Sequence, residues 1–154
     1  PTKSARIRMA EMDAHAIAAI GARKEWFCPQ ILLAEHEGKV LRVICRAMSG
    51  LVIEDRFAAG AGCGFALHMK GKAPVITAVE VDPEDGQSLI LTLSAPIKGA
   101  AHLAYAYGVE GPSGDGFSAN RGALRDGWTA SSRAGDSLYR WALPAFVPCH
   151  PGGV

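Results

Sequence analysis

Side chains that could perform catalysis are present in this sequence, but their spacing does not assemble a site. Asp13 and His15 lie two positions apart in a segment with helical periodicity, which turns their side chains about 200° apart around the helix axis. No serine lies in the G-x-S-x-G turn that exposes a nucleophile. The remaining histidines, which show no spacing typical of metal ligands, are His36, His68, His102 and His150. We therefore expect no catalytic residue, no metal site and no cofactor in this chain.

Two weaker features keep other chemistry open. The glycines from Gly60 to Gly64 look like a phosphate-cradling loop, but neither a Lys-Ser/Thr pair nor a helix start follows them. A turn between two strands is the preferred interpretation. An enzymatic activity of the chain alone remains an alternative, in which Asp126, His102 or His150 would act at a site that no motif defines.

Arginines and aromatic residues gather in the segments from Asn120 to Trp128 and from Leu138 to Trp141. Arginine side chains donate paired hydrogen bonds to hydroxyls or carboxylates, and flat aromatic rings stack on the apolar faces of sugars. On this interpretation Arg121, Trp128 and Asn120 are the candidate ligand-binding residues. A bacterial polysaccharide is the candidate ligand.

The alternative for the same region is structural. In this interpretation Arg125 and Asp126 hold a long loop from Gly108 to Gly135 in one shape through paired hydrogen bonds. Tyr139 and Trp141 would then fill the core beside the last strand. We prefer this alternative for the two aromatic residues and for Arg125 and Asp126, and we leave both interpretations open for Arg121 and Trp128.

Several short motifs follow one another in a recognisable order. They are Gly64-Phe65-Ala66-Leu67, Ser88 to Ser94 with Ala95-Pro96, Leu103 to Gly108, Arg121 to Asp126, and Leu138-Tyr139-Arg140-Trp141. In this order they resemble the C-terminal β domain of phage- and bacterial-type SGNH (GDSL-like) hydrolases, which often carry R-G-N-L-R-D-S and L-Y-N-W. The chain departs from that pattern at Ala123, Gly127 and Arg140, so the usual asparagine and serine side chains are absent.

The resemblance implies that the chain begins just after the catalytic histidine of that family, without its nucleophile and Asp-His blocks. Residues 1–24 would then be the last helix of a preceding α/β hydrolase domain, and residues 25–154 the β domain. The implied function is a non-catalytic accessory β domain of a carbohydrate-active esterase or of a phage tail protein. The alternative is a structural virion or assembly module. In the accessory role the N-terminal helix would contact an upstream hydrolase domain. In the assembly role it would contact further copies of the chain.

One amphipathic helix opens the chain. Its predicted apolar face consists of Ile7, Ala10, Ala14, Ile17 and Ala18. Thr2 or Ser4 can cap its start, and Gly21 suits its end. The segment from Trp26 to His36 is predicted to be a loop.

From Gly38 onward the pattern changes to short β-rich runs that repeat about every ten residues. The predicted strands are 39–47, 51–54, 64–69, 75–81, 88–94 and 102–107, with strand-like sequence again at 138–147. Pro83-Glu84-Asp85-Gly86 predicts a tight turn, and hence a hairpin between 75–81 and 88–94. We therefore expect a mainly β protein, an antiparallel β sandwich or jelly roll preceded by one N-terminal helix.

Charge and composition exclude several partners. The chain has 154 residues and a formal net charge of +1, which gives no electrostatic attraction to nucleic acid or to an anionic membrane. It has no apolar run of the length that spans a bilayer. Its four cysteines, at 28, 45, 63 and 149, form no C-x-x-C pair, so we expect reduced thiols. We expect a soluble protein, cytoplasmic or associated with a virion.

Overall fold

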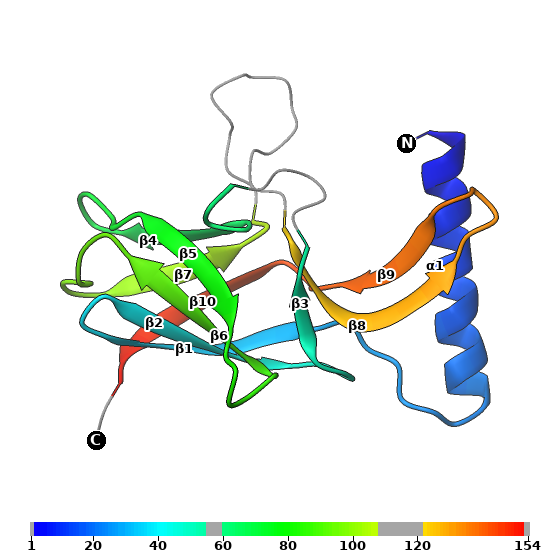
Figure 1. Ribbon diagram of the computed structural model, residues 1–154, viewed down its shortest axis with the longest axis horizontal. Helices are drawn as coiled ribbons and strands as arrows, with labels where there is room; N and C mark the ends of the chain where they lie inside the picture. Colours follow the sequence, from blue (N-terminus) through cyan, green and yellow to red (C-terminus); the bar gives the residue numbers. More distant parts are fainter. Residues whose placement is uncertain (1, 55–59, 108–121, 153–154) are drawn as a thin grey trace.

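The computed structural model describes residues 2–54, 60–107 and 122–152, and Figure 1 shows their arrangement. Helix α1 (Lys3–Gly21) opens the chain, and the Thr2 side chain caps it by accepting a hydrogen bond from the Ala5 N–H at 3.2 Å. The helix does not end through a left-handed glycine at Gly21. The residue with positive φ is Arg23, at 57°, and its N–H donates to the Ile20 carbonyl.

In the part of the chain that the structure describes, ten strands follow the helix and form two sheets. They are β1 (Gln30–Glu37), β2 (Val40–Arg46), β3 (Leu51–Ile53), β4 (Phe65–Met69), β5 (Ile76–Val81), β6 (Ser88–Leu93), β7 (Ala101–Tyr105), β8 (Leu124–Ser131), β9 (Ser137–Trp141) and β10 (Ala145–Pro151). The larger sheet has the order β4-β7-β10-β1-β2-β6-β5, and the smaller one β3-β8-β9. All pairings are antiparallel except β1 with β10. The mainly β fold class with one N-terminal helix is confirmed.

The core lies inside the seven-stranded sheet, which curls until its edge strands β4 and β5 approach each other (Figure 1). Strand β2 shows the alternation that builds this core. Leu41, Val43 and Cys45 are buried, whereas Arg42 and Arg46 face solvent. Because successive side chains of a strand point to opposite faces, this pattern fixes which face of the strand lies inside.

The predicted hairpin is confirmed, because β5 and β6 pair through the turn at Pro83 to Gly86. Asp82 and Asp85 stabilise this turn by accepting hydrogen bonds from the N–H groups of Glu84 and Gln87, each at 3.0 Å. The four cysteines are unpaired, as expected.

Two predicted loops are wrong. The segment 26–36 contains most of β1, and the predicted loop 108–135 contains β8. In β1, residues Glu35 and His36 break the apolar signal, although Ile31 and Ala34 are buried. In β8, Asp126 occupies the buried position between Leu124 and Trp128. Aspartate is typical of loops, so the sequence does not indicate a strand there. Residues 108–121, including the candidates Asn120 and Arg121, lie outside the described residues.

Candidate functional site

The region that brings the predicted site residues together is the contact between α1 and the β8–β9 hairpin. In Figure 1 the helix lies beside this hairpin, away from the curled sheet. Five residues define what we call the helix–hairpin junction, and they are His15, Trp26, Asp126, Trp128 and Arg140. They come from the helix, the connection that follows it, and both strands of the hairpin.

A buried ion pair between Arg140 and Asp126 forms the base of the junction. Arg140 Nη2 lies 2.7 Å from Asp126 Oδ2, and Arg140 Nε donates to Oδ1 at 3.2 Å. The side chains are 4% and 0% exposed. The Nη2 contact is an ion pair whose angle is not that of a hydrogen bond. Oδ1 also accepts from the Trp128 N–H at 3.0 Å, so the carboxylate joins both strands.

Two tryptophans cover this ion pair. The guanidinium carbon of Arg140 lies 5.0 Å from the ring centroid of Trp26 and 5.6 Å from that of Trp128. The two indoles meet edge to face, with centroids 5.0 Å apart. His15 of α1 stacks on Trp26 at 6.3 Å and meets the edge of Trp128 at 5.2 Å. Because a cation is attracted to aromatic faces, this cover offsets part of the desolvation of Arg140.

The other face of the hairpin carries a second arginine. Arg125 Nε donates to Glu54 Oε2, and Arg125 Nη1 donates to the Asp126 carbonyl at 2.7 Å. Its guanidinium carbon also lies 4.6 Å from the ring centroid of Tyr139. Tyr139 meets Trp141 at 5.6 Å on this same face. The expectation that Tyr139 and Trp141 fill the core is wrong, because both are half-buried and the buried residues of β9 are Leu138 and Arg140.

Polar contacts attach α1 to the tip of the hairpin. Arg8 Nη1 lies 3.0 Å from Asp136 Oδ2, and Glu11 accepts from the Ser132 hydroxyl and from the Arg133 N–H, the latter at 2.9 Å. The hydrogen bond from Ser132, followed by that from Arg133, holds the pKa of Glu11 below its ordinary value of 4.5. No side chain of α1 is fully buried, so these contacts carry much of the attachment.

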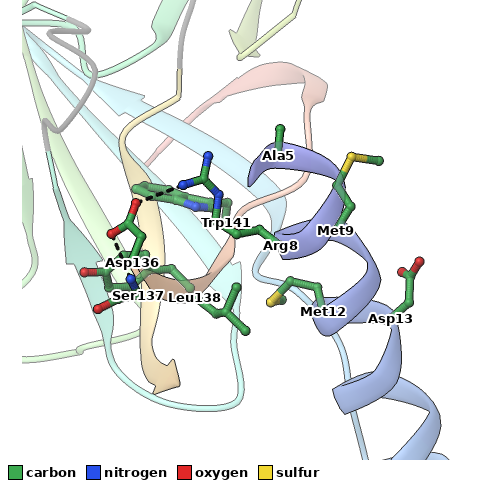
Figure 2. Close-up of a pocket in the computed structure, with 10 residues that line it drawn as sticks. Ala5, Arg8, Met9, Met12, Asp13, Asp136, Ser137, Leu138 and Trp141 are labelled. Atoms are coloured by element: carbon green, nitrogen blue, oxygen red, sulfur yellow. Dashed lines mark hydrogen bonds and ion pairs between the residues drawn. The ribbon is translucent and has the colours of Figure 1, made fainter. Parts of the chain in front are cut away.

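A cleft of about 420 Å³ opens between α1 and β9. Figure 2 shows Arg8, Met9, Met12 and Asp13 on the helix side. The hairpin side is lined by Asp136, Ser137, Leu138, Tyr139 and Trp141. The cleft therefore combines aromatic rings, flexible apolar side chains and an ion pair at its rim.

The structure brings some predicted residues together and separates others. Asp126 lies in the junction, and Trp128 is half-buried within it rather than on an open surface. Arg125 occupies the opposite face with Tyr139. Sequence reasoning missed Arg140, although its position as the departure from the L-Y-N-W pattern was a usable signal. It also missed Trp26, His15 and Glu54, whose neighbours are far away in sequence.

The described residues do not contain a group of three or more His, Cys, Asp or Glu side chains that could hold a metal ion. Within the same residues, no helix is long and apolar enough to cross a membrane. The charged groups of the junction are paired and its aromatic groups are packed on one another, so the junction holds α1 and the hairpin together.

Comparisons with known proteins find solved structures whose fold is similar to that of this chain. No family model and no curated protein matches the chain. The structure of the N-terminal part of the bacterial S-layer protein SbsC is similar, with a TM-score of 0.50 and 14% identity over 92% of this chain and 27% of that chain. The S-layer protein rSbsC(31-844) gives 0.47 and 15% over 92% and 16%, and domains 1–6 of surface layer protein SbsC give 0.49 and 16% over 94% and 17%.

The first of these likenesses concerns the fold alone, since the identity is 14%. This chain spans about a quarter of the length of that S-layer structure. The resemblance to SGNH hydrolases stays a prediction.

Proposed function

We propose that the chain is a non-catalytic structural module of a larger surface or virion assembly. The observation that carries the proposal is the outward face of α1. Ile17 is 70% exposed and Ile20 is 65% exposed, and neither residue lines the cleft between the helix and the hairpin. Large apolar side chains that a helix leaves exposed to water are typical of a surface that binds another surface.

The fold supports the same proposal. The likeness to part of an S-layer protein covers 92% of this chain. That S-layer chain is several times longer than this one. A β domain that recurs inside a longer surface protein is suited to act as a building unit. The accessory-domain role implied by the SGNH resemblance is also non-catalytic. G-D-S and D-x-x-H blocks in frame upstream of Pro1 in the gene would favour it over a purely structural module.

Sedimentation velocity over a range of concentrations tests the proposal. We expect the chain to self-associate, or the natural full-length protein to give chemical cross-links between α1 and another domain or copy. Ile17→Asp together with Ile20→Asp should abolish this association. Val75→Asp is the matched control, because Val75 is 62% exposed on strand-flanking sequence far from the helix.

Two outcomes would contradict the proposal. One is a chain that stays monomeric at every concentration while the full-length protein gives no cross-link to α1. The other is turnover of acetyl-ester substrates by the chain alone, because that would make it an enzyme.

A further inference from the structure

The cleft between α1 and β9 has a composition that the assembly role does not require. Its lining combines the apolar and aromatic side chains of Leu138, Trp141 and Met12 with a group of charged side chains, which we call its rim (Figure 2). A purely apolar ligand would partly desolvate the charged groups of the rim without offering them any hydrogen bond. A small ion would leave the aromatic surface unused. The cleft suits a ligand that presents apolar faces and hydrogen-bonding edges together.

The rim offers both kinds of hydrogen-bonding group. Arg8 supplies N–H donors, whereas Asp13 and Asp136 supply carboxylate acceptors. Arg8 and Asp136 are paired at 3.0 Å, yet their side chains remain 38% and 42% exposed. A guanidinium has five N–H donors and a carboxylate about four acceptor positions, so each can bind a further group without breaking this pair.

We propose that this cleft binds a neutral saccharide, with one sugar ring against the aromatic wall and its hydroxyls on the Arg8–Asp136 rim. A hydroxyl both donates and accepts, so it matches a rim that holds donors and acceptors side by side. The C–H face of a pyranose matches an indole. With Arg8 paired, the carboxylate of Asp13 leaves a negative charge at the rim that disfavours acidic sugars.

Binding in this cleft would join two elements that the fold holds together weakly. One wall is α1, which has no fully buried side chain, and the other is β9. A ligand in contact with both walls binds the attached helix better than the detached one, and it therefore shifts the helix toward the attached state. Saccharide binding should slow amide hydrogen exchange in α1.

The test uses three neutral probes, which are cellohexaose, chitohexaose and maltohexaose, with calorimetry and hydrogen exchange on the whole chain. We expect at least one probe to bind and to protect α1. Trp141→Ala and Asp136→Asn should each weaken that binding about tenfold or more. Phe146→Ala is the matched control, because Phe146 is an aromatic residue that is 45% exposed and outside the cleft, and its removal should leave binding unchanged.

Trp141→Ala could also disturb the fold, so Ala5→Trp provides a second variant that fills the cleft from the helix. Ala5 lines the cleft on the exposed first turn of α1. The proposal is overturned if no probe binds at millimolar concentration, if only an apolar dye binds, or if Ala5→Trp retains full affinity. None of these results bears on self-association through Ile17 and Ile20, so this inference and the proposed function fail separately.

Discussion

At the scale of single residues, packing explains the segment from Gly122 to Asp126 that the sequence marks as unusual. A Cβ on Gly122 would lie 2.2 Å from Tyr105 Oη, so only glycine leaves room for that ring. The Tyr105 hydroxyl accepts from the Leu124 N–H at 2.9 Å. Ala123 and Leu124 are buried, and Asp126 pairs with Arg140. The segment therefore joins the smaller sheet to the core.

The Arg140–Asp126 pair gives the first prediction. Asp126→Ala leaves a buried guanidinium without its counter-charge, and we expect a loss of about 3–5 kcal/mol in the free energy of unfolding. Urea denaturation followed by fluorescence measures this loss. Asp136→Ala is the control, because it breaks an exposed ion pair and should cost about 1 kcal/mol or less. Equal losses for both variants would show that burial does not decide the cost.

Arg125 and Trp128 give a second prediction. Arg125→Ala removes charged hydrogen bonds to Glu54 and to the Asp126 carbonyl, and we expect a loss of about 1–3 kcal/mol. Trp128→Ala should also destabilise the protein, because its ring covers Arg140. The sequence alone predicts a neutral effect for Trp128, by treating it as a surface residue. Arg121→Ala is predicted to melt near the wild type. An Arg125→Ala variant that melts like the parent would refute the structural role.

At the scale of elements, regular periodicity was sufficient where strands bury ordinary apolar residues. Strand β2 follows the alternation expected from sequence, strands β5 and β6 lie within the predicted segments 75–81 and 88–94, and the turn between them has its expected residues. Strand β8 could not be predicted in this way, because its inward positions include Asp126 and Trp128, whose partners lie in β9 and in the connection after the helix. Local pattern carries no information about such distant partners.

Hydrophobic periodicity also predicts the apolar face of the helix, but the structure does not bury most of that face. Apolar spacing correctly indicates a helix, but Ile17, Ala14 and Ala18 of the predicted apolar face are exposed. The side of the helix that faces the hairpin instead carries polar residues such as Arg8 and Glu11, which contact the tip of the hairpin. Periodicity locates a face that can be buried, and only the tertiary structure shows whether this chain buries it.

The attachment of α1 should therefore depend on pH. The pKa of Glu11 is lowered in the folded protein, so its contribution is complete above its ordinary value of 4.5 and is lost as the pH falls through the lower folded value. We expect the hydrogen-exchange protection factors of α1, which correct for the intrinsic pH dependence of exchange, to fall below about pH 4.5, before the core strands open. Glu11→Gln should remove much of this pH dependence. Identical exchange profiles for α1 in both proteins would contradict the prediction.

At the scale of the whole molecule, the cysteines report on the closure of the curled sheet. Burial raises the pKa of Cys45 to about 12 and that of Cys149 to about 11. Because the thiolate is the reactive form, we expect alkylation by iodoacetamide at pH 8 to be slow at both. Cys45 should react only on global unfolding, which peptide mass spectrometry can follow against urea concentration. Rapid labelling of Cys45 in native buffer would show that the core opens locally.

The last prediction concerns the division into a helix, residues 1–24, and a β domain, residues 25–154. The hydrophobic core contains no residue of α1, and its members come from the strands and the turns between them. Because hydrophobic burial is the main favourable term in folding, a chain that begins at Glu25 should keep a cooperative unfolding transition.

Removal of the helix still has a cost, because it uncovers the junction. Trp26 and Trp128 lose the ring of His15, and the hairpin tip loses Glu11 and Arg8. We expect a lower melting temperature with an unchanged β-type circular dichroism spectrum, and increased exchange confined to β8 and β9. A truncated chain that fails to fold would show that α1 is part of the folding unit. If β8 and β9 exchange as in the full chain, the helix does not stabilise the hairpin.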